Sequence, residues 1–205
     1  MPRVSRPSAV WTLLAAPLLA LACDPGDTSG ELDVEPEFRV AVGNVANTDI
    51  ALGALVDGDT IAIYQCGGDQ TFETHTGWFN GTIDADQTFS MTLHDMELTG
   101  TRDEDGISGE LIDTDGTRHA FRVDAVEDDS EEGIYVVADG DVSIGVVVQA
   151  DGNDLTAQGS GCDDRRSCAQ VIILSPLTIE DEAIDVQIDF DGVRDLTVTR
   201  TLEAP

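Results

Sequence analysis

The chain has 205 residues, with 41 Asp and Glu against 10 Lys and Arg, and a formal net charge of −31. A negatively charged surface repels nucleic-acid phosphates, and this chain lacks the basic stripe that electrostatic binding to them requires, so we expect no nucleic-acid partner. All ten of these basic residues are Arg, which excludes Schiff-base chemistry on lysine and the lysine of a phosphate-binding P-loop.

The first 22 residues have the three parts of a secretory signal peptide. Arg3 and Arg6 form a basic start, residues 9–22 form an apolar run, and small residues precede Cys23. The run is shorter than the roughly 20 residues that a membrane-spanning helix needs, and no later segment comes close. We therefore expect the mature chain to have no membrane span.

The segment Leu-Ala-Leu-Ala-Cys over residues 19–23 resembles the lipobox of bacterial lipoproteins. This resemblance implies that cleavage follows Ala22 and that the Cys23 thiol carries diacylglycerol. It also implies that this lipid anchor holds the protein to a membrane of the cell envelope, on the extracytoplasmic side, with the inner and the outer membrane both left open. The alternative is an ordinary secretory signal whose cleavage site merely precedes a cysteine.

The next predicted element is an acidic tether. Residues 24–37 contain six acids, two Pro and two Gly, and almost nothing to bury. Such a segment buries too little apolar surface to offset the entropy of ordering it. We expect residues 23–37 to be disordered and residues 38–205 to form a single β domain.

The domain is expected to be all-β, because its apolar residues come in short runs rich in Val, Ile and Thr that often alternate with polar residues. The runs predict twelve or thirteen antiparallel strands, in the ranges 38–46, 48–56, 59–66, 76–83, 87–94, 107–113, 117–124, 132–138, 142–150, 154–159, 168–175, 183–189 and 194–202. Between them lie six Asp-Gly dipeptides, which favour tight hairpin turns, at residues 57–58, 105–106, 115–116, 139–140, 151–152 and 191–192. We expect a single antiparallel β-barrel or β-sandwich built from Asp-Gly hairpins, since a long open sheet leaves exposed edges.

Three cysteines follow Cys23, and three cannot all pair within one chain. Cys162 and Cys168 flank a polar loop, and the exported setting permits oxidation, so we expect a disulfide between them. Cys66 ends an apolar strand, where a cysteine most often serves as a small buried hydrophobe.

The densest group of chemically useful side chains lies in residues 64–81. It includes His75 and Trp78, and it resembles a group of uncharacterised exported bacterial β-proteins with a Tyr-x-Cys-Gly-Gly strand end followed by His-Thr-x-Trp-Phe-x-Gly. That resemblance implies no activity. One interpretation makes residues 67–77 a polar loop over a barrel mouth, with Asp69 and His75 facing a ligand and Trp78 as its aromatic wall. The competing interpretation makes Trp78 a packing residue and His75 a loop residue bonded to backbone. This second interpretation is favoured, because the aromatics of a domain with few of them usually serve packing first.

Two acidic hairpins are candidates for a weak calcium site. Asp103 and Asp105 in one, and Asp113 and Asp115 in the other, put alternate oxygens beside a glycine, as loops that bind hard cations do. Neither segment has the EF-hand spacing, and hairpin turns alone account for both. No other cofactor is expected.

These features favour a lipid-anchored extracytoplasmic module with a binding or structural role over an enzyme. Its ligand or protein partner is left open, and its contact with a membrane is expected through the lipid anchor only. The alternatives are a hydrolase that uses His75 with a nearby carboxylate, and a calcium-dependent adhesion or binding module.

Overall fold

The computed structural model describes residues 38–190 and 192–203, so the signal peptide, Cys23 and the tether of residues 23–37 lie outside the described residues. The described residues form fourteen β-strands and no helix. The strands are β1 (Val40–Val45), β2 (Ala51–Asp57), β3 (Thr60–Cys66), β4 (Thr76–Thr82), β5 (Thr88–Leu93), β6 (Met96–Asp103), β7 (Gly106–Ile112), β8 (Arg118–Val126), β9 (Gly133–Asp139), β10 (Val142–Asp151), β11 (Asp154–Asp163), β12 (Cys168–Ile173), β13 (Ala183–Asp189) and β14 (Val193–Thr201). In this part of the chain no helix is long and apolar enough to cross a bilayer.

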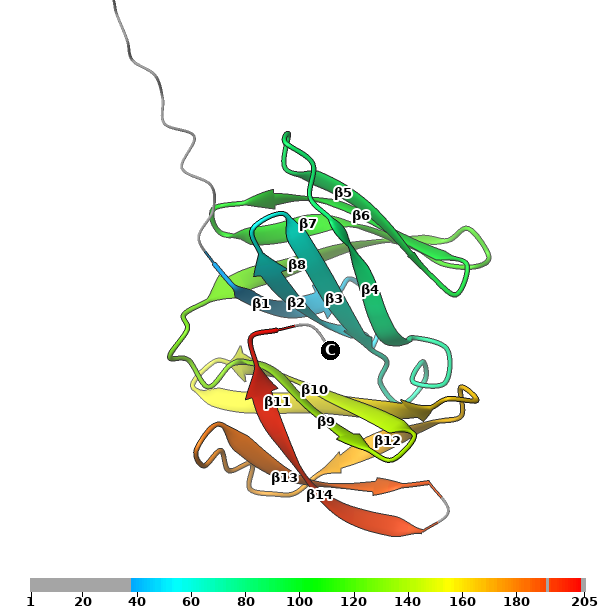
Figure 1. The fold of residues 1–205 in the computed structure, drawn as a ribbon, viewed down its shortest axis with the longest axis vertical. Coiled ribbons are helices and arrows are strands. Elements are labelled where there is room, and N and C mark those ends of the chain that lie inside the picture. The colour runs from blue at the N-terminus through cyan, green and yellow to red at the C-terminus, as the bar shows by residue number, and fades with distance from the viewer. Residues whose placement is uncertain (1–37, 191, 204–205) are drawn as a thin grey trace, which may run out of the picture. The chain divides into compact units, whose positions relative to one another are not determined.

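Strands β1 to β8 form one eight-stranded antiparallel sheet in the order β4-β3-β2-β1-β8-β7-β6-β5 (Figure 1). Its two edge strands come together, because Leu93 and Met91 of β5 pack over Gly77 and Gly81 of β4, where a Cβ atom would lie 3.1 and 2.6 Å from them. The alternating apolar side chains of the strands gather on the enclosed face, with Phe79 at its centre among Ile, Leu and Met residues. The sheet therefore curls around a core of its own.

Strands β9 to β14 close into a barrel in the order β10-β11-β12-β13-β14-β9. Its core is built from Val and Ile side chains around Tyr135, whose hydroxyl donates to the carbonyl of Glu131 at 2.8 Å. The expected all-β antiparallel fold is confirmed, and the strands divide between an eight-stranded sheet and a closed barrel.

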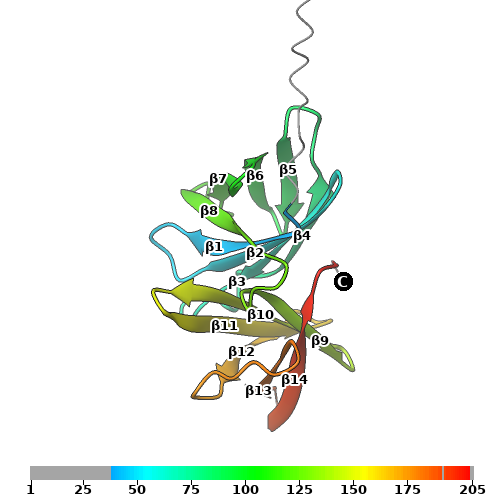
Figure 2. The ribbon, with the colours of Figure 1, turned by 90° about the vertical axis from the view of Figure 1, so that its left-hand side faces the viewer.

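A third apolar cluster joins the sheet to the barrel, with β1, β2 and β3 on one side and β9 and β10 on the other (Figures 1 and 2). Two glycines let the strands approach. A Cβ on Gly53 would lie 2.4 Å from Ile134, and one on Gly145 would lie 2.5 Å from the ring of Tyr64. The Tyr64 hydroxyl reaches β11 of the barrel and donates to the carbonyl of Ser160 at 2.8 Å.

Glycine opens three of the hairpin turns. Gly58, Gly140 and Gly152 have φ values of 58°, 68° and 67°, in the left-handed region that favours glycine. Each is the first residue of a two-residue loop, and the Asp before it is the last paired residue of its strand. The Asp-Gly pair therefore straddles the end of the strand in these hairpins instead of supplying both turn residues. Asp191, in the last dipeptide, lies outside the described residues.

Strand β6 was not predicted from the sequence, because the predicted strand ranges leave residues 95–106 without a strand. It follows β5 through a two-residue turn formed by His94 and Asp95, with φ values of 49° and 67°. A turn with both central residues at positive φ is the type that joins adjacent antiparallel strands, and Asp and His enter this region more readily than most side chains. Because the turn contains no glycine, it gives no Asp-Gly signal.

Candidate functional site

The loop of residues 67–75 between β3 and β4 is tightly folded. The Gly67 N–H donates to the carbonyl of His75 at 2.8 Å, and the His75 N–H donates to that of Thr71 at 2.8 Å. A Cβ atom on Gly67 would lie 2.5 Å from the Thr71 backbone, and one on Gly68 would lie 2.6 Å from the carbonyl oxygen of Asp49. The paired glycines are thus required by close backbone packing, which places His75 at the entry to β4.

Asp49, in the turn between β1 and β2, fastens this loop. Its Oδ2 accepts from the Gln70 N–H at 2.7 Å, and its Oδ1 accepts from the Thr71 hydroxyl at 2.7 Å. Partial burial by itself raises the pKa of the Asp49 carboxyl, but the hydrogen bonds from Gln70 and Thr71 outweigh it, so the pKa is lower than usual.

His75 is buried, with 7% of its surface exposed, and both ring nitrogens have partners. Its Nε2 lies 3.1 Å from Oδ2 of Asp113, and its Nδ1 lies 2.8 Å from the hydroxyl of Thr74. An ionised carboxylate only accepts hydrogen bonds, so Nε2 carries a proton and, in the neutral ring, Nδ1 accepts from Thr74. The result is a hydrogen-bonded line from hydroxyl to imidazole to carboxylate.

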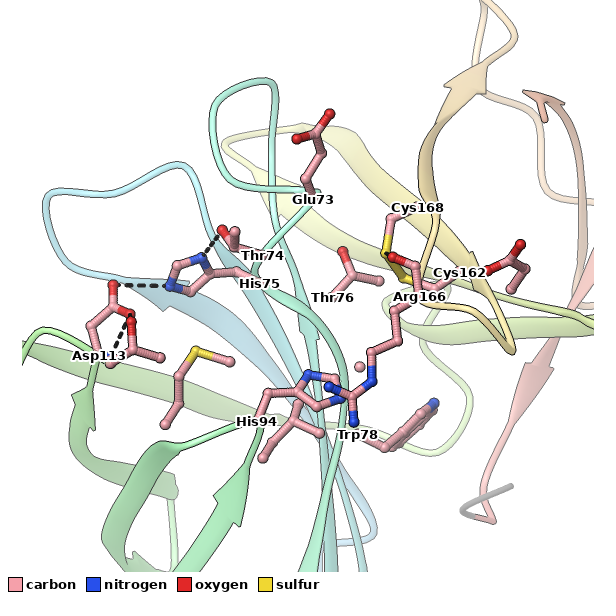
Figure 3. Close-up of a pocket in the computed structure, with 15 residues that line it drawn as sticks. Glu73, Thr74, His75, Thr76, Trp78, His94, Asp113, Cys162, Arg166 and Cys168 are labelled. Atoms are coloured by element: carbon pink, nitrogen blue, oxygen red, sulfur yellow. Dashed lines mark hydrogen bonds and ion pairs between the residues drawn. A yellow bond between two sulfur atoms is a disulfide. The ribbon is translucent and has the colours of Figure 1, made fainter. Parts of the chain in front are cut away.

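A cavity of about 500 Å³ lies beside the hydrogen-bonded line of Thr74, His75 and Asp113 (Figure 3). Its apolar lining comes from Trp78 of β4, Leu93 at the end of β5 and Met96 at the start of β6, together with the Cys162–Cys168 disulfide. Its polar lining comes from the Thr74, His75 and Asp113 line, from the β5–β6 turn and from the β11–β12 hairpin. The eight-stranded sheet and the barrel thus each supply one wall.

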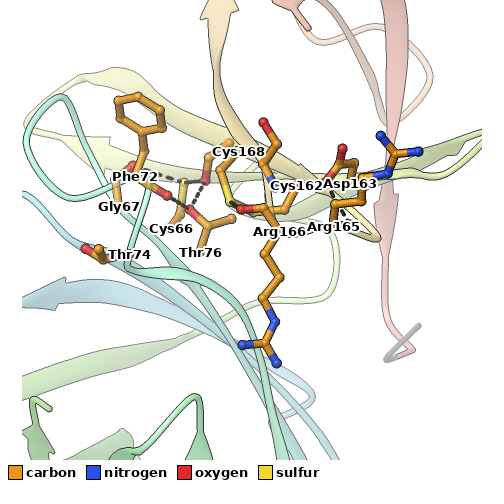
Figure 4. The surroundings of a disulfide bond; sticks show 12 residues. Cys66, Gly67, Phe72, Thr74, Thr76, Cys162, Asp163, Arg165, Arg166 and Cys168 are labelled. Carbon is orange, nitrogen blue, oxygen red and sulfur yellow. Dashed lines mark hydrogen bonds between the residues drawn. A yellow bond between two sulfur atoms is a disulfide. The ribbon is translucent and has the colours of Figure 1, made fainter.

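The predicted disulfide between Cys162 and Cys168 is confirmed and closes the β11–β12 hairpin (Figure 4). Inside the hairpin, Oδ1 of Asp163 accepts from the N–H groups of Arg165 and Ser167 at 2.9 and 2.8 Å. The backbone that carries Arg166 is therefore fixed by a covalent bond and by hydrogen bonds.

Cys66 is buried and makes no disulfide, and its burial raises the pKa of the thiol to about 12. Its Sγ lies 3.2 Å from the Ser160 hydroxyl, which in turn lies 2.8 Å from the hydroxyl of Thr76. A thiol with this pKa stays protonated at neutral pH, so it is a poor nucleophile and serves as a packing residue.

Of the three residues predicted to bind a ligand, the structure brings together His75 and Trp78, which both line the cavity. Asp69 does not join them. It lines a separate depression, which it shares with Asp49 and Gln158. Trp78 also packs against Tyr64, with ring centroids 5.1 Å apart, so the packing contact expected of it is present.

The four aspartates proposed for calcium lie in two hairpins at opposite ends of β7. Asp103 pairs with Arg122 at 2.9 Å and accepts from the N–H of Asp105, while Asp113 contacts His75. Asp115 accepts from the N–H of Thr117 at 2.8 Å. Among the described residues no group of three or more His, Cys, Asp or Glu side chains is placed to hold a metal ion, so the structure gives no support to a site there.

Met96, His94 and Arg166 are among the cavity side chains that were not predicted as site residues from the sequence. Met96 and His94 belong to the undetected turn and strand. Arg166 lies within the predicted disulfide loop, and its basic character in an acidic chain was the available signal. Comparisons with protein-family models, with curated proteins and with solved structures give no match to this chain.

Asp49→Asn should lower the free energy of unfolding by about 2 kcal/mol at pH 7, because hydrogen bonds to a charged acceptor contribute about 1.5–3 kcal/mol. The lowered pKa of Asp49 means that the stabilisation is fully present above 3.8, the usual value, and is lost as the pH falls through the lower folded-state value. Thermal unfolding at pH 7 and near pH 2 should therefore show a gap between wild type and variant that closes in acid.

The matched control is Asp69→Asn, because Asp69 is an exposed neighbour for which the structure shows no side-chain hydrogen bond. It should melt like the wild type at both pH values. Equal melting of Asp49→Asn and Asp69→Asn at pH 7 would show that the Asp49 contacts do not hold the loop.

Proposed function

We propose that this protein is a lipid-anchored extracytoplasmic module that binds a small molecule in the cavity beside Trp78. The observation that carries the proposal is the cavity itself, whose volume of about 500 Å³ lies within the roughly 300–1,000 Å³ of typical small-molecule sites. Such sites are mostly apolar and contain a few polar groups that orient the ligand, which matches the lining described above.

The walls of the cavity are held in place before any ligand arrives. Trp78 is supported from behind by Tyr64, and the facing hairpin is closed by the disulfide. A preformed site loses little conformational entropy when it binds, which favours affinity. Trp78 supplies a flat surface for stacking, and Leu93 and Met96 supply adaptable apolar contacts.

Phenylnaphthylamine, a neutral dye that brightens in apolar surroundings, should bind the full chain saturably. Trp78→Leu should weaken this binding about tenfold, because loss of one aromatic contact is worth roughly 1.4 kcal/mol. A fluorescence titration measures both affinities, and a thermal melt checks that the variant is folded.

The control for dye uptake is Ile172→Ser, which removes an apolar side chain that is 48% exposed and lies outside the cavity. Its affinity for the dye should equal that of the wild type. Absence of saturable uptake, or equal losses in Trp78→Leu and Ile172→Ser, would sink the binding proposal.

The lipid anchor is proposed from residues 19–23, whose sequence matches a lipobox in all but its usual leucine at Ala20. Stable attachment needs two or more acyl chains, which a lipidated N-terminal cysteine would carry. In a bacterial host, the wild type should enter the detergent phase on Triton X-114 partition, and Cys23→Ala should stay in the aqueous phase. Cys66→Ala removes a different thiol and should behave like the wild type; equal partition of all three chains would rule out an anchor at Cys23.

A second candidate function, ester or acyl hydrolysis, is favoured by the line from Thr74 through His75 to Asp113. In such a line the carboxylate orients the imidazole, and the imidazole takes the hydroxyl proton as the oxygen attacks the ester carbonyl carbon. The imidazolium then gives that proton to the leaving alcohol as the ester C–O bond breaks, and a water molecule activated by the imidazole releases the acyl group and restores the hydroxyl. Thr74 is exposed at the rim of the cavity, where its oxygen can meet a substrate.

If the chain is a hydrolase, its turnover of nitrophenyl acetate should fall by about a hundredfold or more in His75→Gln and in Thr74→Val, since general-base catalysis typically contributes that much. Initial rates followed by absorbance test this. His119→Gln controls for nonspecific catalysis by a surface imidazole and should keep the wild-type rate. Turnover no faster than in buffer, or an unchanged rate in His75→Gln, would exclude this candidate.

A further inference from the structure

We propose that the ligand of the cavity carries an anionic oxygen group, of the carboxylate, sulfonate or phosphate class, and that the guanidinium of Arg166 binds it next to His94. This inference rests on the proposed binding function and specifies the chemistry of its ligand.

The arginines of the chain differ in their pairing with acidic side chains. Although the chain carries 41 acidic residues, no hydrogen bond or ion pair to the Arg166 guanidinium is present among the described residues. By contrast, Arg118, Arg122 and Arg194 form ion pairs with carboxylates at 2.8 to 3.1 Å. Arg39, Arg102 and Arg165 also lack an ion pair in the part that the structure describes, but none of them lines the cavity. Arg166 is thus the unpaired guanidinium that a ligand can reach from inside the site.

The direction of the Arg166 side chain also favours this role. Arg166 sits at the turn of the β11–β12 hairpin with φ 65°, and its N–H donates to the carbonyl of Asp163 at 2.9 Å. Figure 3 shows the side chain reaching from the hairpin toward His94. Burial and, after it, the positive charge of Arg166 lower the pKa of His94, and they outweigh the neighbouring Asp95 carboxylate, which raises it.

The acidic side chains that line the cavity form no ion pair with Arg166. The Asp113 carboxylate is engaged by His75, and Oδ1 of Asp163 accepts two backbone N–H groups of its own hairpin. Glu73 is the other carboxylate of the lining, and it is exposed in the loop before β4. Figure 3 shows Glu73 and Arg166 reaching into different parts of the site. The guanidinium therefore keeps its donors for a bound anion, which it can contact with two parallel hydrogen bonds.

The position of Trp78 adds a shape requirement. Trp78 and Arg166 both line the cavity, one from β4 and the other from the hairpin. A ligand with a planar apolar part stacked on the indole and an acidic group directed at the hairpin would contact both walls at once. Long-range repulsion from the net charge of −31 disfavours anions elsewhere on this surface, so an anion that binds needs a local cation.

The test compares two dyes with one aromatic skeleton, the neutral phenylnaphthylamine and the anionic anilinonaphthalene sulfonate, in fluorescence titrations of the full chain. We expect the sulfonate to bind the wild type more tightly than the neutral dye. Arg166→Gln should weaken sulfonate binding about tenfold or more, since charge-assisted hydrogen bonds are the strong ones, and change the affinity for the neutral dye less than about twofold.

Arg165→Gln is the matched control, because it removes an adjacent exposed guanidinium from the same hairpin outside the cavity lining. It should leave the affinity for both dyes unchanged. If the neutral dye binds but the sulfonate binds no more tightly, or if Arg165→Gln and Arg166→Gln weaken the sulfonate equally, the anion inference is wrong and the binding function stands. If neither dye binds saturably, both are wrong.

Discussion

The hydrogen bond from the Tyr64 hydroxyl to the carbonyl of Ser160 crosses between the eight-stranded sheet and the barrel. It is part of the buried contact between them, and the candidate site depends on that contact. Buried polar groups are costly unless they are paired, and here the hydroxyls of Tyr64, Thr76 and Ser160 find partners across the boundary. The pair between Thr76 and Ser160 also fixes what lies further along each strand. Two residues beyond Thr76 is Trp78, and two residues beyond Ser160 is the disulfide, so one buried contact sets the two facing walls of the cavity.

Much of the fold could be predicted from the sequence because alternation of apolar and polar residues is a local signal. Thirteen of the observed strands overlap the predicted ranges, and the short spacing of Cys162 and Cys168 pointed to their bond. The strand that was missed, β6, follows a turn made by His94 and Asp95, whose positive φ values no glycine announces. The pairing of β1 with β8 joins residues about eighty apart in the chain, and no local pattern contains it.

The candidate site was predictable only in part, because local sequence patterns do not show which distant residues the fold brings together. His75 and Trp78 could be found because they lie in one segment dense in reactive and aromatic side chains. Their partners come from elsewhere: Asp113 from the end of β7, and Arg166 from a hairpin of the barrel. Asp69 shares the segment but lines another depression. Neighbourhood in the sequence therefore identified the site residues within β4 and directly before it, and failed for those that the tertiary contacts bring in.

The place of β1 within its sheet has a mechanical consequence. It is the first strand of the described chain, yet it lies in the interior of the sheet, with β2 bonded along one side and β8 along the other. A pull along the strand, applied on the N-terminal side of Val40, would load both ladders in shear at once, instead of peeling an edge strand one bond at a time. Because forced unfolding is governed by the rate of unfolding, this placement should make the domain resist tension applied along β1.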